Sequence, residues 1–378
     1  MTQSRPASAS VGRRYSLAVF IGRFQPVHLG HLEVISQALV VADTLLLVLG
    51  SANAARSFHY VPFTATEREQ MIRLCLTAEQ NARIKFLYTE DQGNMPKWTG
   101  AIGAAAREIE SDNSKITLIG HAKDHSSYYL KGFPNWSSTD VDSYLGLSAT
   151  TFRNDFLSVT DTIVVNTDGN QIPWFWKGPS VKGLHESTVD WLRYFSTTDD
   201  YNYLVEERRS VEATIAKYGK GPFLTGDAVV IQGDHVLMIE RGNYPFKGCL
   251  AFPGGFVEEG ERMVDAIFRE LDEETKLKVP ANQLRQSLVH TELLDAPHRD
   301  PRGRIVSLAG LIYLNPIPPA SMTNPKDIAN FVSLPRVRAS DDAAKAHWMP
   351  ISSIKRERCA FDVYQVLHTM LDFIPKEA

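Results

Sequence analysis

The sequence predicts an α/β protein of two domains. Its 378 residues exceed the length at which a single hydrophobic core usually divides. Over the first half, short apolar strands alternate with helices, a pattern typical of a parallel sheet covered on both faces. Near Asp200 the alternation stops, and a charged helix is followed by a β-hairpin pattern. A second domain of different construction is therefore expected after that point.

The first half contains four predicted strands with helices between them. The strands are short apolar runs rich in branched side chains, and the helices carry apolar residues at helical spacing. In chain order, strand and helix alternate at residues 17–21, 31–42, 44–49, 67–76, 84–87, 98–110 and 116–119. The strands are mainly apolar and alternate with helices, so we expect both faces of the sheet to be covered.

The second half begins with a change of pattern. Residues 203–218 predict one charged helix, which the sequence Gly-Lys-Gly-Pro at residues 219–222 ends. Two short strands joined by a Gly-Asp turn then predict a hairpin at residues 227–240. The predicted division is a loose tail at 1–14, a first domain at 15–200, a linker helix at 201–221 and a second domain at 222–378.

Composition narrows the classes of function. The net charge of −4 argues against a nucleic-acid binder, which needs a basic face. Three scattered cysteines are too few for a disulfide framework or a zinc site and suit a reducing compartment. The longest apolar run, residues 44–50, is too short to span a bilayer, and the polar tail lacks the apolar core of a signal peptide. A cytoplasmic protein without nucleic-acid or membrane partners is expected, and a homo-oligomer is compatible with the sequence.

The first chemical pattern is the string G-R-F-Q-P-V-H-L-G-H, which starts at Gly22 where the first strand ends. In an open parallel sheet, ligands bind beside such a turn, at the start of the following helix. His28 and His31 can lie on one helix face and point at the same phosphate, with Arg23 as a nearby cation. Gly30 lets a nucleotide approach the backbone. An isolated H-x-x-H pair is usually accidental, but its place in the predicted phosphate-binding turn favours function.

This string resembles the nicotinamide mononucleotide adenylyltransferase branch of the nucleotidylyltransferase superfamily, whose mark is H-x-G-H. Matches extend over most of residues 17–160, and the string S-A-T-T-F-R at residues 148–153 resembles the family's second phosphate motif. Hydroxyls and free N–H groups at a helix start, followed by an arginine, suit polyphosphate recognition. Many relatives have a hydroxyl-bearing residue or glycine where this chain has Ala149. Backbone N–H groups can replace the lost hydroxyl in phosphate binding. The resemblance implies a Rossmann-like domain with a parallel sheet.

The resemblance also implies a role for each matching residue. Those implied to contact or clamp the ATP phosphates during catalysis are Arg23, His28, His31 and Arg153. Further ATP or phosphate contacts are implied for Gly22, Phe24, Gly30, Arg56, Ser148 and Thr150. Asn94 and Trp98 match positions that hold nicotinamide mononucleotide, where an indole stacks on the pyridinium ring. Packing in the protein core is the alternative role for Trp98.

The implied reaction needs no protein nucleophile. The 5′-phosphate of nicotinamide mononucleotide attacks the α-phosphorus of ATP, which gives NAD and pyrophosphate, with Mg²⁺ at the leaving group. The protein positions the reactants and stabilises charge. Phosphopantetheine and flavin mononucleotide are alternative acceptors, because H-x-G-H alone does not choose between them. Asn94 and Trp98 favour the nicotinamide nucleotide.

The second chemical pattern lies on a predicted helix at residues 263–275. Helical spacing puts the carboxylates of Glu270, Glu273 and Glu274 on one face, and the expected buried stripe consists of Val264, Ile267, Phe268 and Leu271. Three adjacent carboxylates repel one another unless hard cations lie between them, so we expect a Mg²⁺ or Mn²⁺ site. Arg269 is expected to pair with Glu261, and Gly254 and Gly255 form a turn that can close on a metal-bound diphosphate.

These residues resemble the Nudix box, G-x5-E-x7-R-E-U-x-E-E-x-G-U, at every fixed position but one. The resemblance implies a Nudix hydrolase domain of α/β/α layers with a mixed sheet. The departure is Lys276, where the box has a glycine that ends the helix in the left-handed region. A lysine there costs about 1 kcal/mol, and because it is no metal ligand, activity should survive.

The string R-D-P-R-G-R at residues 299–304 resembles a loop of ADP-ribose pyrophosphatases. Arg299, Arg302 and Arg304 suit a diphosphate and its terminal ribose, although a basic surface loop is the alternative. The implied reaction is hydrolysis of ADP-ribose to AMP and ribose 5-phosphate, with Glu270, Glu273 and Glu274 holding the metals. Candidates for the general base are Glu273, Glu292 and Asp295.

The whole chain resembles bacterial fusions of a nicotinamide mononucleotide adenylyltransferase with a Nudix hydrolase. The expected ligands are ATP, nicotinamide mononucleotide, NAD and ADP-ribose. One alternative is a second domain that senses ADP-ribose or NAD without turnover, which the complete carboxylate set disfavours. A nucleic-acid-binding regulator is the other, and the net charge of −4 disfavours it.

Overall fold

The computed structural model describes residues 14–90, 95–120, 132–141, 147–158, 163–165, 171–173, 178–315, 333–340 and 343–375. The chain forms two compact units. The first comprises Met1–Asn53 and Val61–Val205, and the second comprises Ala54–Tyr60 and Glu206–Ala378. The division falls inside helix α7 (Asp199–Tyr218), which begins four residues before the predicted helix. The predicted tail lies outside the described residues except for Arg14.

The first unit contains a sheet of five parallel strands, as the strand–helix alternation predicts. In chain order the strands are β1 (Tyr15–Gly22), β2 (Ala42–Leu49), β3 (Ile84–Tyr88), β4 (Ile116–Gly120) and β5 (Ser137–Asp140). They lie in the order β3-β2-β1-β4-β5. Strand β5 was not predicted, because its sequence Ser-Ser-Thr-Asp is polar and lacks an apolar run. The strand order reverses at β1, where open sheets of this kind form a ligand crevice.

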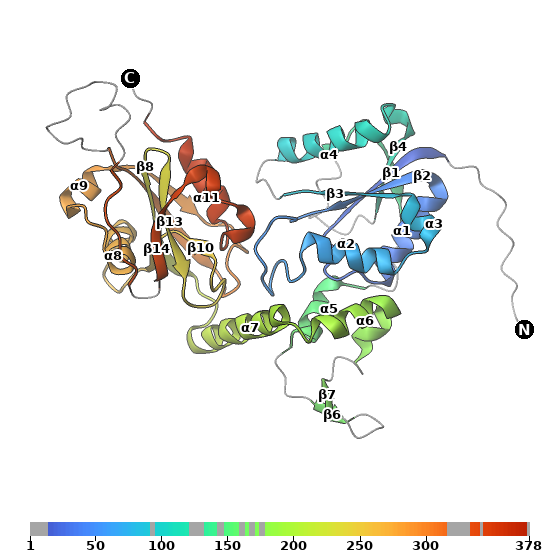
Figure 1. The fold of residues 1–378 in the computed structure, drawn as a ribbon, viewed down its shortest axis with the longest axis horizontal. Coiled ribbons are helices and arrows are strands. Elements are labelled where there is room, and N and C mark those ends of the chain that lie inside the picture. The colour runs from blue at the N-terminus through green and yellow to red at the C-terminus, as the bar shows by residue number, and fades with distance from the viewer. Residues whose placement is uncertain are drawn as a thin grey trace, which may run out of the picture. The chain divides into compact units, whose positions relative to one another are not determined.

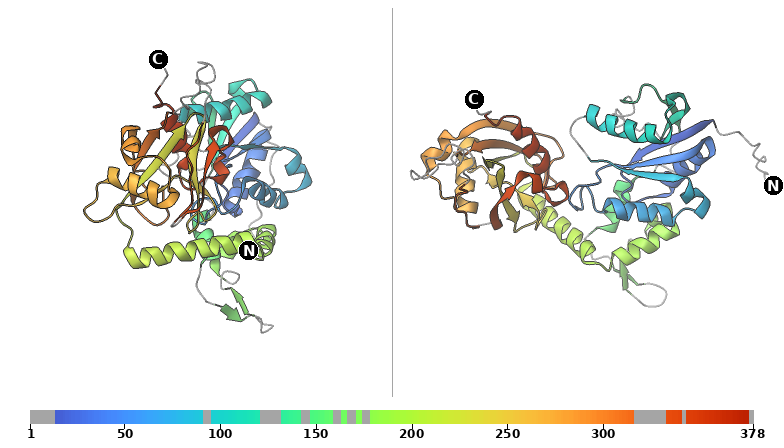
Figure 2. Two further views of the ribbon diagram at one scale, coloured as in Figure 1. Left: turned by 60° about the vertical axis from the view of Figure 1, so that its left-hand side comes forward. Right: turned by 45° about the horizontal axis from the view of Figure 1, so that its top comes forward.

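Helices cover both faces of this sheet (Figure 1; Figure 2, right). Helix α4 (Met95–Ile109) packs through Ile102 and Ala106 on a face that includes Leu17 and Val19. On the opposite face lie α1 (Leu29–Val41) and α2 (Ala65–Leu74). The remaining described elements of this unit are α3 (Ala78–Ala82), η1 (Asn113–Lys115), α5 (Ala149–Phe156), β6 (Ile163–Val165), β7 (Gln171–Pro173), η4 (Pro179–Gly183) and α6 (Glu186–Phe195).

The second unit contains a mixed sheet. Its strands are β8 (Phe223–Gln232), β9 (His235–Arg241), β10 (Leu250–Ala251), β11 (Gly254–Phe256), β12 (Leu288–Leu294), β13 (Ile305–Tyr313) and β14 (Ala343–Pro350). Five of them lie in the order β10-β9-β8-β13-β12, while β11 pairs with β8 and β14 with β9. Strands β13 and β8 are parallel, and the other pairs are antiparallel. The predicted hairpin is confirmed, since Ile231 pairs with Val236 across the turn.

Two helices sandwich this sheet and complete the predicted α/β/α layers. Helix α8 (Met263–Thr275) buries Ile267 and Leu271 on one face, whereas α11 (Val363–Leu371) packs on the other. Of the predicted stripe, Val264 and Phe268 are only partly buried. The other described helices of this unit are α9 (Ala281–Gln286), η5 (Ile351–Ser353) and η6 (Arg356–Arg358).

A short segment from early in the sequence belongs to the second unit. Ala55 is part of the same hydrophobic core as strands β8 and β9. The carboxylate of Glu207 is fully buried and accepts hydrogen bonds from the backbone N–H groups of Phe58 and Phe246, both at 2.8 Å. Burial raises the pKa of Glu207, and these amide bonds partly oppose that shift. The second unit is therefore not continuous in sequence.

Helix α8 ends as the box comparison predicts, with Lys276 in the left-handed region at φ 43° and ψ 39°. We expect Lys276→Gly to raise the free energy of unfolding by about 1 kcal/mol, because glycine adopts this conformation without the penalty of a Cβ. Urea unfolding checks this. Lys276→Ala is the matched control, since it removes the 3.1 Å ion pair with Asp272 but keeps the Cβ. A stabilisation by alanine equal to that by glycine would contradict the backbone explanation.

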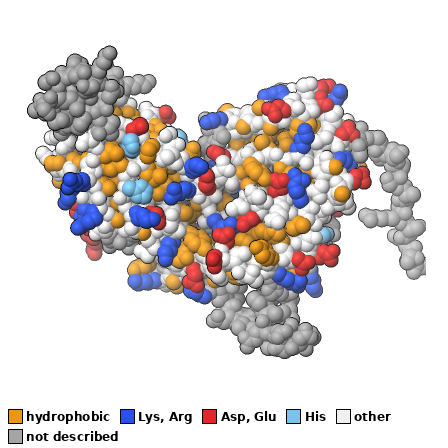
Figure 3. Space-filling model, viewed as in Figure 1, with side chains coloured by type: hydrophobic (Ala, Val, Ile, Leu, Met, Phe, Trp, Pro, Cys, Tyr) orange, Lys and Arg blue, Asp and Glu red, His pale blue; other side chains and the backbone are white. Residues whose placement is uncertain are grey.

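Among the described residues, none of the helices combines the length and apolar character needed to cross a membrane. On the face drawn in Figure 3, described acidic and basic side chains are mixed over the surface of both units. No broad basic surface is visible among the described residues on that face.

Candidate active sites in the two units

The first site forms where β1 passes into α1. His28 is the N-cap of α1 and is buried, and its backbone N–H lies 3.3 Å from Nδ1 of His31. The two imidazole rings stack with their centroids 3.7 Å apart. Gly30 lies in the first turn of the helix, between the two histidines. Both rings are thus fixed at a helix N-terminus, where free N–H groups and the helix dipole favour an anion.

Helix α5 brings a second set of predicted residues to the same turn. Arg153 donates from Nη1 to the carbonyl of Gln25 at 3.0 Å and from Nη2 to the hydroxyl of Thr150 at 3.1 Å. Burial, and then the nearby charge of Arg23, lower the pKa of Arg153 to about 10. Two guanidinium groups that repel each other in this way favour an anion between them. Ser148 caps α5 and is exposed.

Phe24 and Gly22 shape the turn itself. Phe24 is buried with a φ of 50°, and its ring centroid lies 4.8 Å from that of His31. A Cβ at Gly22 would lie 2.9 Å from the Phe24 ring, so a larger residue would displace it. These two residues therefore support the histidine pair by packing, in the place where the resemblance implies nucleotide contacts.

Arg68 is a site residue that the sequence reasoning missed. It is fully buried in α2 and donates to the carbonyls of Arg23 at 2.9 Å, Gly50 at 2.7 Å and Ser51 at 3.2 Å. A buried charge of this kind is stable only with such partners. It fixes the carboxyl ends of β1 and β2 beside the histidine turn. In the sequence, Arg68 is simply a charged residue in the helix that follows Pro-Phe-Thr. A charged residue in a helix is too common to mark a site.

For three other residues, the predicted nucleotide contacts stay predictions. Arg56 lies in the segment Ala54–Tyr60, which belongs to the second unit. Trp98 is partly buried and packs against the core beneath α4, so the core-packing alternative applies to at least part of its ring. Asn94 lies outside the described residues. The nicotinamide-binding assignment of Trp98 and Asn94 stays a prediction.

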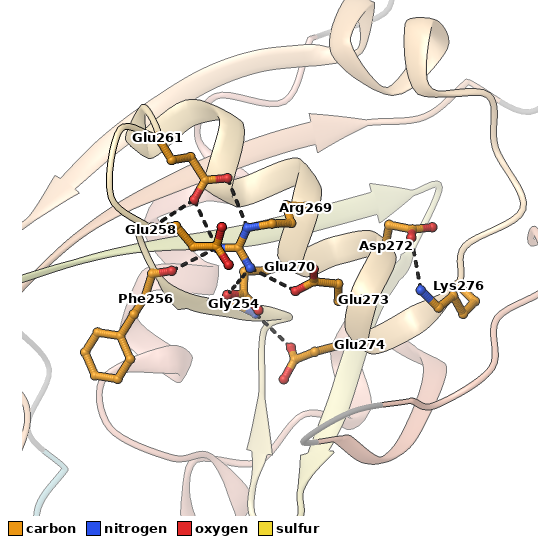
Figure 4. Close-up of polar contacts among 10 residues, drawn as sticks. All are labelled: Gly254, Phe256, Glu258, Glu261, Arg269, Glu270, Asp272, Glu273, Glu274 and Lys276. Carbon is orange, nitrogen blue, oxygen red and sulfur yellow. Dashed lines mark hydrogen bonds and ion pairs between the residues drawn. The ribbon is translucent and has the colours of Figure 1, made fainter. Parts of the chain in front are cut away.

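The second site is built around Arg269 on α8 (Figure 4). Its guanidinium donates to both carboxylate oxygens of Glu261 at 3.0 Å, which is the pair that the sequence predicts. It also donates to Glu270 and Glu273, both at 2.8 Å, and to the carbonyl of Phe256 at 2.8 Å. The hydrogen bonds with Glu261 and the other carboxylates raise the pKa of Arg269. Arg269 thus fastens the loop before α8 to the helix.

The two glycines before this loop let carboxylates approach the backbone. A Cβ at Gly255 would lie 2.3 Å from a carboxylate oxygen of Glu270, and one at Gly254 would lie 2.3 Å from Asp227. The N–H of Gly254 donates to Glu274 at 2.9 Å. Any larger residue at Gly254 or Gly255 would push the carboxylates away from the loop.

The carboxylates of α8 suit a hard divalent cation by their chemistry, since such ions prefer oxygen ligands. Arg269 pairs with three carboxylates, those of Glu261, Glu270 and Glu273, so this group keeps an excess of negative charge. The expected convergence of three glutamates is not present, however. Within the described ranges, no group of three or more His, Cys, Asp or Glu side chains is arranged to hold a metal ion. To bind a metal ion, Glu270 or Glu273 would have to break its hydrogen bond with Arg269 and coordinate the ion.

A cavity of about 140 Å³ lies beside this cluster, and its wall includes Gly254, Gly255 and Glu274. Arg299 and Arg302 from the R-D-P-R-G-R string line it as well. Arg299 binds Asp362 through two bonds of 2.9 and 2.8 Å, and Arg302 binds Asp300 through two of 3.0 and 2.7 Å. Arg304 is not part of the described wall, and its side chain approaches Asp295 at 4.0 Å. The box and the arginine loop thus meet at one cavity, with Arg299 and Arg302 already paired.

Two further charged residues of the wall were missed from the sequence. Arg241, at the end of β9, is half-buried, and its removal from solvent, followed by the charge of Arg302, lowers its pKa. Asp227 in β8 is half-buried behind Gly254 and accepts a hydrogen bond from the Ser307 hydroxyl, and its removal from solvent raises its pKa. Neither belongs to a recognisable motif, so only the folded chain reveals them.

Of the candidate general bases, Glu273 lies in the Arg269 cluster. Glu292 hydrogen bonds with His290 at 3.2 Å. None of Glu273, Glu292 and Asp295 is part of the described cavity wall, but Glu273 is next to Glu274, which is. This arrangement favours Glu273 among the three, because a base must reach the attacking water.

Comparisons with known proteins agree with these two sites. Residues 19–131 match the Cytidylyltransferase-like family model, and residues 223–369 match the NUDIX domain model. The Nicotinamide/nicotinic acid mononucleotide adenylyltransferase of Acinetobacter baylyi is 32% identical over 53% of this chain and 97% of its own length. The ADP-ribose pyrophosphatase of Methanocaldococcus jannaschii is 30% identical over 39% of this chain and 71% of its own length.

One solved structure is similar along nearly the whole chain. It is a bifunctional NMN adenylyltransferase/ADP ribose pyrophosphatase from Francisella tularensis, complexed with AMP and a manganese ion. It is 30% identical, has a TM-score of 0.77, and the match covers 95% of this chain and 99% of that one.

Proposed function

The chain belongs to the family of bifunctional nicotinamide mononucleotide adenylyltransferases/ADP-ribose pyrophosphatases, and from this premise we propose that it performs both reactions. The first unit transfers AMP from ATP to nicotinamide mononucleotide, which gives NAD and pyrophosphate. The second unit hydrolyses ADP-ribose to AMP and ribose 5-phosphate. The observation that carries the proposal is the presence of two separate charged arrangements, the histidine turn of β1–α1, which suits phosphates, and the cavity beside α8, which is lined by carboxylates and arginines.

In the first unit, the protein acts by positioning. His28 and His31 hold the ATP phosphates at the N-terminus of α1, and Arg23 and Arg153 stabilise the charge that develops on the transferred phosphorus and the leaving pyrophosphate. Arg68 keeps the two strand ends at a fixed distance from this turn. No side chain forms a covalent bond with the substrate in this scheme. Trp98 and Asn94 stay the proposed contacts of the nicotinamide nucleotide.

In the second unit, Glu270, Glu273 and Glu274 would hold divalent cations. Bound there, such cations acidify a water molecule and offset the charge of the diphosphate. Glu273 is the proposed acceptor of the proton from that water. Gly254 and Gly255 let the loop approach the diphosphate, and Arg299, fixed by Asp362, also lines the cavity. Arg304 stays a proposed substrate contact that the cavity does not support.

Three finer points belong to this proposal. Magnesium is the proposed physiological cation, and manganese is the ion in the similar structure from Francisella tularensis. The proposed location is the cytoplasm, on the strength of the sequence alone. Self-association is compatible with the sequence, and the molecular mass in solution tests it.

A paired assay on the purified chain with Mg²⁺ tests the proposal. We expect NAD from ATP and nicotinamide mononucleotide in one reaction, and AMP from ADP-ribose in the other. NAD without AMP would favour the alternative in which the second unit senses its ligand without turnover. AMP without NAD would contradict the nicotinamide nucleotide as acceptor, and phosphopantetheine and flavin mononucleotide would then be tested.

A further inference from the structure

Strand β12 lies at one edge of the second unit's sheet. Among the strands that the structure describes, it pairs with β13 alone, so its other edge presents backbone N–H and C=O groups to which a further strand can bond. Its pairing with β13 is regular from His290 to Leu294. Edge strands are commonly protected from unwanted pairing by lysine or proline, and the sequence Leu-Val-His-Thr-Glu-Leu-Leu contains neither. The edge is therefore suited to the addition of a second strand.

Large apolar side chains are exposed along this edge. Val289 is 41% exposed and Leu293 is 55% exposed, and these residues alternate with the half-buried His290 and Glu292. The exposed ring of Phe373 stacks on His290, with the two ring centroids 3.6 Å apart. Removing apolar side chains from water is favourable, and a group of them on an unpaired strand edge indicates a contact surface.

The sequence of β12 is symmetrical about Thr291. On each side of this residue lies one polar side chain, His290 or Glu292, followed by two apolar ones. In an antiparallel pair of two such strands with a twofold axis at Thr291, Val289 of one copy faces Leu293 of the other. His290 of each copy then faces Glu292 of the other. A twofold axis at Glu292 would instead place two like charges face to face, which is unfavourable.

We propose that β12 pairs with β12 of a second copy of this chain, antiparallel and centred on Thr291. The sheets of the two copies then continue into each other across the twofold axis. His290 already hydrogen bonds with Glu292 of its own strand at 3.2 Å, so each imidazole has a carboxylate beside it and another opposite it. A strand of unrelated sequence would form the backbone bonds without these side-chain matches, which favours a second copy as the partner.

The mass of the full chain in solution tests this pairing. One strand from each copy makes a small contact compared with most stable interfaces, so we expect a dimer that dissociates on dilution. Sedimentation equilibrium over a range of concentrations measures its Kd. Thr291→Lys places two like charges face to face on the axis and should raise this Kd at least about tenfold. Because Thr291 is exposed, the variant should stay folded, which circular dichroism checks.

A mixture of two variants tests the register. Thr291→Glu alone should weaken the dimer in the same way as Thr291→Lys. The two variants mixed in equal amounts should associate again, because opposite charges then face each other on the axis. Leu224→Lys is the matched control, since it adds a charge at a residue that is 47% exposed on β8, a strand inside the sheet. It should leave the Kd unchanged.

Three outcomes would overturn the proposal. A monomeric mass of the unchanged protein at every concentration would show that the edge binds no second copy, whichever other protein it contacts. An unchanged Kd in Thr291→Lys would show that any dimer forms through another surface. Failure of the mixed variants to associate would contradict the register centred on Thr291. These measurements do not depend on NAD formation or ADP-ribose hydrolysis, so failure of the proposed function is a separate result.

Discussion

Replacing His31 with alanine should reduce kcat for NAD formation by about 100- to 1000-fold, the size of effect seen when one group that stabilises transition-state charge is removed. The His31 ring lies in the first turn of α1, stacked on His28 with centroids 3.7 Å apart, at the point where helix N–H groups favour the phosphates. Initial rates with ATP and nicotinamide mononucleotide at saturation measure the loss. Because the site acts by positioning charge, we expect the loss in kcat to exceed the change in either KM.

The control for His31→Ala lies on the same helix. Ser36 is exposed on α1, so Ser36→Ala should leave the rate unchanged. Hydrolysis of ADP-ribose by the same His31→Ala protein reports on folding of the second unit, and circular dichroism reports on the first. A near-normal kcat in a folded His31→Ala protein would contradict the proposed phosphate-binding role of the histidine pair.

Glu273→Gln should lower kcat for ADP-ribose hydrolysis by at least about 100-fold and leave NAD formation unchanged. Glutamine keeps an oxygen that can accept from Nη1 of Arg269, now 2.8 Å from the Glu273 carboxylate, so the shape of the cluster is retained. The substitution removes the negative charge that Glu273 needs both to bind a cation and to accept a proton. The measurement is the release of AMP at saturating ADP-ribose, with NAD formation assayed on the same sample.

Asp272→Asn provides the matched control for Glu273→Gln. It removes the same charge at the adjacent residue of α8, but Asp272 is exposed and pairs with Lys276 outside the cavity. We expect this variant to hydrolyse ADP-ribose at the normal rate. Loss of both NAD formation and hydrolysis in Glu273→Gln would argue against two independent sites. Retention of both activities would show that a residue other than Glu273 accepts the proton.

Local patterns predicted the features that depend on near neighbours. The alternation of apolar strands and helices predicted the parallel sheet, and helical spacing predicted helix α8, although the carboxylates of Glu270, Glu273 and Glu274 do not converge as expected. The left-handed end of that helix at Lys276 followed from one mismatch in the box. Where the local signal was weak, the prediction failed, as for the polar strand β5.

Contacts between residues far apart in sequence were not predictable in this way. Arg299 and Asp362 are 63 residues apart, and Phe58 and Glu207 are 149 apart. The sequence around each of these residues does not identify its partner, because the packing of whole helices and strands determines which residues meet. The predicted ATP contact of Arg56, whose segment Ala54–Tyr60 is grouped with the second unit, stays a prediction.

The sequence by itself determined which elements form, and it supplied the two motifs whose residues lie within one turn or one helix. It could do so because backbone hydrogen bonds and side-chain spacing in such elements involve residues only a few positions apart. Only the tertiary structure decided that Arg68 fixes two strand ends, that Arg299 and Arg302 are paired with carboxylates, and that Phe256 stands exposed at the cavity edge. Those features arise when distant segments are brought together by burial of their common core, which no local window of sequence contains.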